Sequence, residues 1–338
     1  MKVYEMNYRL YRQKMIRDAA VMHIPILGEF ELTARCNLHC DMCYVVDSHA
    51  QDLSTETWIT IFKQAVEAGL VFAILTGGEF FVRQDAILLY KTLYDLGVRI
   101  TLFTNGTDIT QTIADELEKR PPEMVLISLY GASNETYQKV TKYKQGFDRL
   151  KEGITLLKSH HIKVMLRTLP LQALYHDLDD MIAFAKKQDL TLNYLRYIGP
   201  SRSGLNQASS LRLSPELLIE FEAKLQNAFG YESALSFTTS TEDATCAALK
   251  SGYFISHKGM MQPCAMAYTP TKSVINEDFK QVFDTLALEL RAIERFDLCR
   301  TCSHQASCMQ CYARRMLETG SQSCPPYLKA YAKLKGSD

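Results

Sequence analysis

Three cysteines stand close together near the start of the chain, in the stretch ELTARCNLHCDMCY at residues 31–44. Cys36, Cys40 and Cys43 are thiolate donors of the kind that bind zinc or iron–sulfur clusters. A structural zinc site needs four ligands in a closed shell, but the next cysteine of this chain is Cys246. Three thiolates around a cube of four irons leave one iron with an open position. The spacing therefore favours a reactive iron–sulfur cluster over a zinc site or plain buried cysteines.

The motif C-x3-C-x2-C, followed by the aromatic residue Tyr44, resembles the radical S-adenosylmethionine (radical SAM) enzymes. The resemblance implies that S-adenosylmethionine chelates the open iron through its amino and carboxylate groups, with Tyr44 among the cofactor contacts. It also implies that an electron from the cluster cleaves the sulfonium and produces a 5′-deoxyadenosyl radical. The missing fourth thiolate is then the place where the cofactor binds.

Two glycines and a glutamate, Gly77, Gly78 and Glu79, follow the next apolar run in the stretch LTGGEFF. Glycines allow backbone to approach a ligand closely, and the carboxylate can pair with a cation. The triplet is similar to the GGE motif of radical SAM enzymes, which implies a contact with the methionyl amino group. Proline usually follows in that family, whereas Phe80 follows here, and this change touches no ligand group.

Three further residues lie where later strands are expected to end. Asn105 belongs to a TNG turn and Ser128 to the stretch ISLYG, and the resemblance implies that such residues contact the ribose or line the pocket. Arg167 could meet the cofactor carboxylate. The simpler alternatives are an ordinary Asn-Gly turn, a strand hydroxyl and a surface guanidinium.

The other seven cysteines all lie in the C-terminal part, in the pattern C-x12-G-x4-C, C-x2-C-x5-C-x2-C and a final lone cysteine. Paired C-x2-C motifs can form a zinc ribbon, but ribbons separate their pairs by roughly 15–20 residues. Only five residues intervene here. A run this dense suits thiols that are divided between neighbouring iron–sulfur clusters.

This layout resembles the SPASM extension of radical SAM proteins, which carries two auxiliary 4Fe–4S clusters, and Gly259 occupies its motif glycine. The resemblance assigns four cysteines to an outer cluster: Cys299, Cys302, Cys308 and Cys324. It assigns three to an inner cluster: Cys246, Cys264 and Cys311. The family usually ends the run with C-x3-C, one residue longer than the C-x2-C of this chain. Because two closed cubes need eight thiolates, one auxiliary iron is either open or bound by His257 or Asp243.

Alternating apolar runs and amphipathic segments predict the scaffold that must position these residues. A helix is expected from Ser54, its N-cap, to Gly69, and another between Asp85 and Gly97. Parallel strands with right-handed helical crossovers curl toward a barrel, so the fold class is α/β with a partial (β/α)6 barrel of the radical SAM type. Chemistry is expected at the carboxyl ends of its strands. The six predicted strands are residues 26–32, 71–75, 98–103, 123–129, 162–169 and 192–198.

The predicted domain organisation has four parts. Residues 1–27 form an N-terminal cap, residues 28–205 the barrel, residues 206–240 a linker that contains a helix at 214–229, and residues 241–338 the cysteine-rich SPASM domain. The cap is too short for the winged-helix domain with which many peptide maturases bind a leader. Leader binding is therefore assigned to the barrel, the tail or a separate carrier protein.

Charge and hydropathy limit the partners of the chain. Lys and Arg together number 38, as do Asp and Glu, so no net field attracts nucleic acid or a membrane surface. The N-terminus lacks the apolar segment of a signal peptide, and no apolar run approaches the roughly 20 residues of a membrane span. We therefore predict a cytoplasmic protein whose thiols serve metal binding rather than disulfides.

SPASM proteins mostly modify ribosomally made peptides, and the resemblance therefore implies oxidative modification of a precursor peptide, as a thioether or carbon–carbon crosslink. It also implies an electron donor such as flavodoxin or ferredoxin. A sulfatase-maturase activity is disfavoured because Ala265 replaces the family's catalytic Asp. Epimerases need a free donor cysteine, which is lacking if the clusters use all ten. A small-molecule substrate, a non-catalytic iron–sulfur carrier and a zinc-binding module remain as alternatives. The sequence names no catalytic base.

Overall fold

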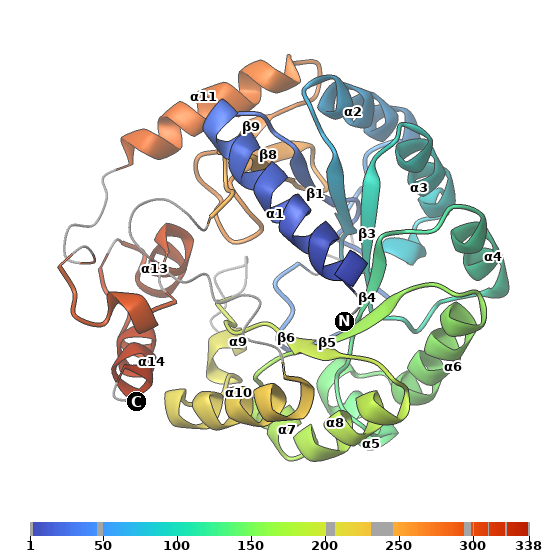
Figure 1. Cartoon of the computed structure of the whole chain (residues 1–338), viewed down its shortest axis with the longest axis vertical. Coiled ribbons are helices and arrows are strands. Elements are labelled where there is room, and N and C mark those ends of the chain that lie inside the picture. The colour runs from blue at the N-terminus through green and yellow to red at the C-terminus, as the bar shows by residue number, and fades with distance from the viewer. Residues whose placement is uncertain are drawn as a thin grey trace.

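Six parallel strands form the predicted partial barrel, and each pairs with the next along the chain (Figure 1). The computed structural model describes residues 3–45, 50–200, 207–230, 246–293, 299, 301–309, 311–321 and 323–336. The strands are β1 (Leu27–Glu31), β2 (Phe72–Thr76), β3 (Arg99–Thr104), β4 (Met124–Ser128), β5 (Val164–Thr168) and β6 (Leu192–Tyr194). The bounds of β1, β2, β3 and β4 agree with the predicted ranges to within one residue at each end, whereas β5 begins two residues later and β6 ends four residues earlier than predicted. There the chain turns so that Arg196 pairs with Glu222, with 2.7 Å between Nε and Oε1.

Helices connect the strands and surround the barrel (Figure 1). They are α2 (Thr55–Glu67), α3 (Ala86–Asp95), α4 (Gln111–Lys119), α5 (Asn134–Thr141), α6 (Gly146–Ser159), α7 (Gln172–Tyr175) and α8 (Leu178–Lys187), with the 3-10 turn η1 (Phe80–Val82). Ser54 caps α2 as predicted and accepts a hydrogen bond from the Thr57 amide at 3.2 Å. Asp85 precedes α3 but makes no capping bond, because its carboxylate binds the Arg83 guanidinium and the Thr55 hydroxyl instead. A charge-assisted pair is a stronger partner than a backbone amide.

The side chains of β1 divide between the helical layer and the barrel interior. The Phe30 ring packs edge-on against the rings of Trp58 and Phe62 on α2, so Phe30 faces the helices. Successive residues of a strand point to opposite faces. Glu29 and Glu31 therefore face the interior of the barrel, and this orientation places carboxylates where a bound molecule would lie.

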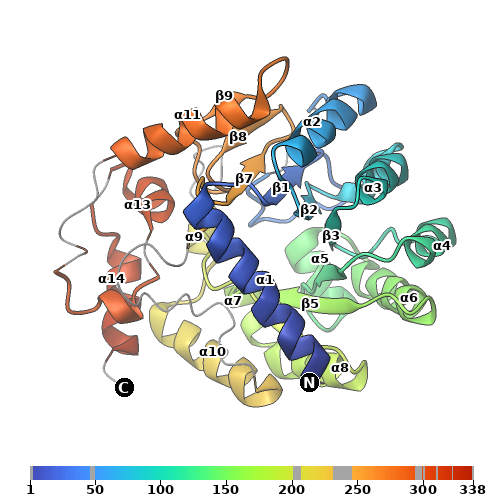
Figure 2. The ribbon, with the colours of Figure 1, turned by 45° about the horizontal axis from the view of Figure 1, so that its top comes forward.

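The helix α1 (Val3–Met22) crosses the amino ends of the strands (Figure 2). Arg12 pairs with Glu123 just before β4 and lies 4.8 Å from the ring centre of Phe72 at the start of β2. Ala19 joins Phe72 and Ile26 in a small buried cluster. The helix thus packs as a cap on the barrel, on the side opposite the carboxyl ends of the strands.

The sheet continues beyond the barrel into the cysteine-rich part, where the sequence analysis named no strand. The strand β7 (Gly252–Ile255) pairs in parallel with β1, and β8 (Met260–Gln262) and β9 (Lys272–Ser273) follow in antiparallel pairs. The helix α11 (Phe279–Ala292) covers this extension (Figure 1). The Tyr253 ring stacks edge-on between Phe30 and Phe279, so apolar contacts hold β7 against β1.

The remaining helices pack beside β6 at the other end of the sheet. They are α9 (Gln207–Ser210), α10 (Pro215–Phe229), α13 (Tyr312–Thr319) and α14 (Pro326–Lys335), with the 3-10 turn η2 (Gln305–Ser307). The helix α10 matches the predicted helix at 214–229, and Tyr331 of α14 donates a hydrogen bond to its Glu222 at 2.9 Å. None of the helices in the described part of the chain is long and apolar enough to cross a membrane.

Replacement of Tyr253 by phenylalanine is expected to leave the free energy of unfolding unchanged or raise it by about 1 kcal/mol. The Tyr253 hydroxyl is buried and has no hydrogen-bond partner among the described residues, so its removal abolishes a desolvation cost. The matched control is Tyr90→Phe, because the buried Tyr90 hydroxyl donates to the Arg120 carbonyl oxygen. This control should lose about 1 kcal/mol in urea unfolding. Equal losses of unfolding free energy in the two variants would contradict the conclusion that the Tyr253 hydroxyl has no hydrogen-bond partner.

Candidate functional site

The loop after β1 carries the first three cysteines and is held by backbone hydrogen bonds. The Leu38 amide donates to the Cys36 sulfur at 3.4 Å, and the Val45 amide donates to the Cys43 sulfur at 3.5 Å. The Cys43 amide donates to the Cys40 carbonyl oxygen at 3.1 Å, which closes a turn between the two thiols. Amide donors aimed at sulfur stabilise thiolate ligands. The loop therefore has the donor chemistry of an iron–sulfur site.

The three thiols influence one another electrostatically, so they are neighbours in space. Burial raises the pKa of Cys36 to about 12, and the Cys43 thiol adds to this shift. Burial also raises the pKa of Cys40 well above its ordinary value, with further contributions from Cys43 and Cys36. Metal binding displaces such protons, because the thiolate is the ligand. No three acidic, histidine or cysteine side chains in the described ranges form a group tight enough for one single metal ion.

Gly77 and Gly78 let the loop after β2 run directly against the loop after β1. The Gly78 amide donates to the Thr33 carbonyl oxygen at 2.8 Å, and the Glu79 amide donates to the Arg35 carbonyl oxygen at 2.9 Å. A Cβ atom added at Gly78 would lie 2.3 Å from the Arg35 oxygen, and one at Gly77 would lie 2.6 Å from the Thr33 oxygen. These backbone atoms cannot yield easily. The glycines are thus required for contact between the two loops, in addition to any contact with a ligand.

Glu79 is fully buried at the carboxyl end of the barrel. Its carboxylate accepts hydrogen bonds from the Thr104 hydroxyl at 2.7 Å and from the Asn105 amide at 2.6 Å. The Phe81 amide donates to it at 3.2 Å. Burial raises the pKa of Glu79 to about 7, and these three donors act in the opposite direction. Glu79 therefore ties the GGE loop to the end of β3, and its three hydrogen-bond donors are neutral groups rather than a cation.

The TNG turn after β3 brings Asn105 to the cysteine loop. The Asn105 side-chain amide donates to the Asn37 side-chain oxygen at 2.7 Å and lies 3.9 Å from the Cys36 sulfur. Sequence reasoning treated Tyr130 as part of a motif around Ser128 and gave it no role. Burial raises the pKa of Tyr130 well above its ordinary value, the three thiols add to the shift, and a hydrogen bond with Ser128 lowers it. Ser128 and Asn105 therefore both lie close to the three-cysteine loop.

Arg167 faces the interior of the barrel from β5, beside Ser128 in the strand register. Its guanidinium carbon lies 4.8 Å from the ring centre of Phe103. Burial lowers the pKa of Arg167 to about 10, and the negative charges of Glu29 and Tyr44 act in the opposite direction. Arg167 thus lies within electrostatic reach of Tyr44. The roles of Arg167 and Tyr44 as cofactor contacts stay predictions, as do those of the other predicted contacts.

The C-terminal cysteines separate into two neighbourhoods. Burial raises the pKa of Cys264 to about 12, and the thiols of Cys246 and Cys311 contribute. Burial likewise raises the pKa of Cys299, with contributions from Cys324 and Cys302, while Arg315 lowers it and donates to the Cys299 sulfur at 3.4 Å. Cys311 therefore lies with residues far away in the sequence rather than with the nearby Cys302.

Cys308 is linked to Cys302 by the turn η2. The Gln305 amide donates to the Cys302 carbonyl oxygen at 3.1 Å, and the Cys308 amide donates to the Gln305 carbonyl oxygen at 3.2 Å. These bonds fold the five intervening residues compactly. The arrangement is compatible with Cys308 as the fourth member of the outer group.

His257 does not lie with the inner group of cysteines. It occupies the tip of the hairpin between β7 and β8, where the Ser256 amide donates to the Met260 carbonyl oxygen. In the hairpin register Phe254 lies opposite Gln262, so Cys264 lies beside the start of β7. At about 3.3 Å per residue, the five residues from Gly252 to His257 separate these positions by roughly 16 Å. His257 is therefore not a ligand of this group, and Asp243 lies outside the described residues.

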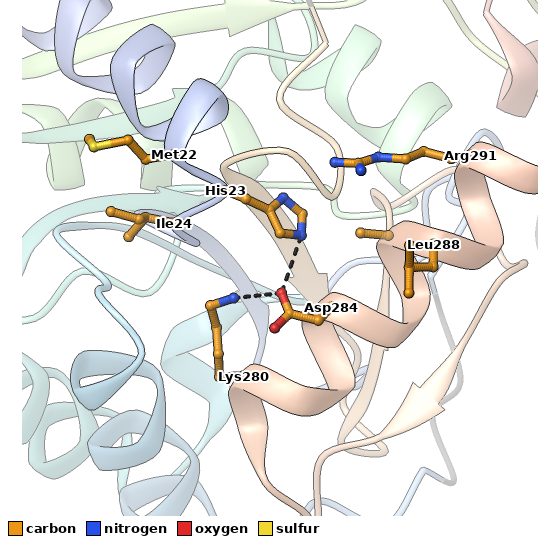
Figure 3. Close-up of a pocket in the computed structure, with 8 residues that line it drawn as sticks. Met22, His23, Ile24, Lys280, Asp284, Leu288 and Arg291 are labelled. Carbon is orange, nitrogen blue, oxygen red and sulfur yellow. Dashed lines mark hydrogen bonds and ion pairs between the residues drawn. The ribbon is translucent and has the colours of Figure 1, made fainter.

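Two surface cavities lie away from all of these residues. One, of about 290 Å³, lies between the end of α1 and α11, where Asp284 contacts His23 at 3.2 Å and Lys280 at 2.5 Å (Figure 3). The other, of about 950 Å³, includes Lys158 and Asp189. None of the residues that line them is a predicted site residue. The predicted chemistry therefore belongs to the carboxyl ends of the strands.

Substitution of alanine for Gly78 is expected to separate the loops after β1 and β2, because the new Cβ atom collides with backbone. The expected cost is about 1–3 kcal/mol in urea unfolding, with a reduced iron content after anaerobic reconstitution. Gly336→Ala is the control, since its Cβ would lie 3.1 Å from the Ser307 hydroxyl, 3.3 Å from the Ala332 carbonyl oxygen and 3.7 Å from the His304 ring, with no contact under 3.0 Å. A Gly78→Ala protein with the stability and iron content of the control would refute the role of this contact.

Glu79 predicts a pH-dependent stability that Glu79→Gln should remove. The folded pKa of about 7 exceeds the ordinary glutamate value of 4.5, so the contribution is fully present below pH 4.5 and is lost as pH rises through 7. The stability of the wild type relative to the variant should fall by about 2 kcal/mol between pH 5.5 and pH 8 in urea unfolding. Any cost of the amide in Glu79→Gln that does not depend on pH is the same at every pH, so it does not affect this change in stability. Glu116→Gln is the control, because Glu116 is paired with Lys119 and its pKa is lowered. A constant difference across this range would contradict the burial argument.

Sequence comparisons agree with the geometry of the site. Residues 30–185 match the Radical SAM superfamily model. The chain is 22% identical over 331 residues to AdoMet-dependent heme synthase of Methanosarcina barkeri, which covers 89% of this chain and 95% of that protein. It is 30% identical over 160 residues to PqqA peptide cyclase of Ruegeria pomeroyi, which covers 46% of this chain and 42% of that protein.

The fold is similar to that of SuiB from Streptococcus suis. The structure of SuiB bound to S-adenosylmethionine gives a TM-score of 0.70 at 16% identity and covers 88% of this chain and 75% of that one. The structure bound to precursor peptide SuiA gives a TM-score of 0.70 at 15% identity, with 94% and 79% covered. The predicted α/β barrel is confirmed by this likeness and by the strand order. Residues 30–185 of this chain therefore form a radical SAM domain, as the three-cysteine loop and the GGE motif predicted.

Proposed function

We propose that this chain is a radical SAM/SPASM peptide maturase that oxidatively modifies a ribosomally synthesised precursor peptide, with a thioether or carbon–carbon crosslink as the product. The observation that carries the proposal is the sorting of the cysteines. One group follows β1, and the C-terminal cysteines divide into the two neighbourhoods that two auxiliary clusters require. The proposal is supported by the name of PqqA peptide cyclase and by the structural neighbour SuiB, which was solved bound to a precursor peptide.

The residues fit three 4Fe–4S clusters and one S-adenosylmethionine, with seven cysteines in the C-terminal part. Bound together, the first cluster and S-adenosylmethionine supply a 5′-deoxyadenosyl radical that abstracts a hydrogen atom. Cys36, Cys40 and Cys43 would hold the first cluster, and Gly77, Gly78 and Glu79 would shape the wall that receives the methionyl group. Asn105, Ser128, Arg167 and Tyr44 would complete the cofactor pocket.

The residues of the cysteine-rich part also argue against sulfatase-maturase and epimerase activity. A sulfatase maturase needs an acid after the inner-cluster cysteine, and Ala265 stands there. An epimerase needs a donor thiol, and all ten cysteines have places in the three groups. A cytoplasmic location, a separate leader-binding protein and a flavodoxin or ferredoxin as electron donor complete the proposal.

Radical chemistry on a small molecule is the second candidate. It is favoured by one observation, because AdoMet-dependent heme synthase matches 89% of this chain whereas PqqA peptide cyclase matches 46%. The two candidates share the clusters and the radical. They differ in the molecule that loses the hydrogen atom.

Metal analysis after anaerobic reconstitution tests the cluster content. Four irons for each cube give about twelve irons per chain, with equal sulfide and no zinc. Cys36→Ala should lose about four irons and all 5′-deoxyadenosine formation from S-adenosylmethionine and dithionite. Cys264→Ala, the matched variant, should also lose up to about four irons but retain 5′-deoxyadenosine formation. About four irons with zinc present would remove the auxiliary clusters from the proposal.

Coexpression with short peptides encoded beside the gene tests the substrate class. The expected product is a peptide that has lost two hydrogen atoms per crosslink, detected by mass spectrometry and absent with Cys36→Ala. Formation of 5′-deoxyadenosine that responds to a small molecule and to none of these peptides would favour the second candidate.

A further inference from the structure

Glu31 and His257 form a buried pair that joins the barrel to the cysteine-rich part. The distance between Glu31 Oε1 and His257 Nδ1 is 2.6 Å, although 226 positions separate the two residues in the sequence. Glu31 is 0% exposed and His257 is 8% exposed. Glu31 is not a predicted site residue, and the hairpin register separates His257 from the inner cysteine group for which it was a candidate ligand. The pair therefore needs an explanation of its own.

The pair lies at the carboxyl ends of the strands. Glu31 is the last residue of β1, faces the barrel interior and lies opposite Thr76, directly before the GGE motif. His257 follows β7 on the other side of β1. Cys36 lies only five residues beyond Glu31. The imidazole is thus close to both loops that shape the radical site.

The hydrogen bond fixes which ring nitrogen can accept a proton. A carboxylate accepts from Nδ1–H, so the neutral imidazole carries its lone pair on Nε2. The His257 Nε2 atom is buried and has no hydrogen-bond partner among the described residues. Such a nitrogen is costly to bury, and a carboxylate behind it stabilises the imidazolium that forms on protonation. This is the arrangement of a general base: the carboxylate fixes the orientation of the ring, and the Nε2 lone pair is available to accept a proton.

We propose that His257 is the proton acceptor for the substrate and that Glu31 positions it. The inference rests on the proposed function, because loss of two hydrogen atoms from the peptide is the loss of one hydrogen atom, one proton and one electron, and the electron would pass to an auxiliary cluster. An N–H, O–H or S–H bond of the substrate breaks, a bond from Nε2 to that hydrogen forms, and the electron pair stays on the substrate atom. The imidazolium then returns the proton to water. Ala265 cannot perform this step, so the base must come from another element.

The elements beside the imidazole carry several charged groups. Glu31 and Glu29 lie on β1, Lys258 follows His257 in the hairpin, and Arg83 binds the carbonyl oxygen of the residue after Glu31. Among the described residues, Glu31 is the charged group that contacts the ring directly. Substitution of Glu31 therefore tests the direct contact.

The first test is nuclear magnetic resonance of the protein with 15N-labelled histidine, with His257→Asn used to assign the signal. Nδ1 should carry a proton at pH 8, because the Glu31 carboxylate can only accept a hydrogen bond. Glu31→Gln should weaken this preference, because its side-chain amide can also donate. A ring protonated at Nε2 and not at Nδ1 at pH 8 would overturn the proposal.

The second test compares two variants with the modified peptide as readout. In His257→Asn the side-chain amide takes the place of Nδ1–H and can still donate to Glu31, but Nε2 is absent. We expect 5′-deoxyadenosine formation close to wild type and peptide modification reduced at least about 100-fold, as for loss of a general base. His23→Asn, on the surface beside Asp284, is the control. Wild-type modification by His257→Asn would show that the pair is only structural.

The outcomes distinguish this inference from the proposed function. If the wild type makes no 5′-deoxyadenosine, the proposed function fails and the inference fails with it. If the wild type modifies the peptide and His257→Asn does so equally, only the inference fails. Partial recovery of the His257→Gly variant by added imidazole would support the proton role, since a lost structural bond is not restored in this way.

Discussion

The carboxyl end of β1 is the constraint on which the rest of the site depends. β2 and β7 both pair with this strand in parallel, so its last residues are held from both sides. The cysteine loop leaves from this point and is fixed by hydrogen bonds to the GGE loop on one side. On the other side His257 reaches Glu31. A shift of one residue in β1 would turn Glu29 and Glu31 toward the helices and Phe30 toward the barrel interior.

Buried polar groups give the interior of the barrel its chemical character. Glu79 and Glu31 carry carboxylates that are removed from water, and Arg167 places a guanidinium over an aromatic ring. Each is costly to bury, and each is held by particular neighbours rather than by solvent. The hydrogen bonds of Glu79 join the loops of the site to one another, whereas Glu31 and Arg167 point into the barrel interior. This division separates the residues that build the site from those that would act in it.

The C-terminal part shows how two neighbourhoods arise from one dense run of cysteines. Cys302 and Cys308 stay together because η2 folds the chain between them. Cys311 follows after only two residues, yet it lies with Cys246 and Cys264 as α13 begins. The boundaries of the four predicted domains stay a prediction, and the sheet itself runs through β1 into β7. The cysteine-rich part therefore shares a hydrogen-bonded edge with the barrel.

The sequence by itself determined the features that depend on short spacing and on periodicity. Thiols with three and two residues between them must share one loop, two glycines permit backbone contact, and alternating apolar runs define the six barrel strands. The tertiary structure alone decided the contacts across long separations. β7 has only four residues, GYFI, too few to reveal a pairing partner, and its place beside β1 follows from the packing of Tyr253 against Phe30. That pairing excludes His257 from the inner cysteine group and brings it to Glu31, because the order of strands in a sheet is fixed by side-chain packing and not by spacing along the chain.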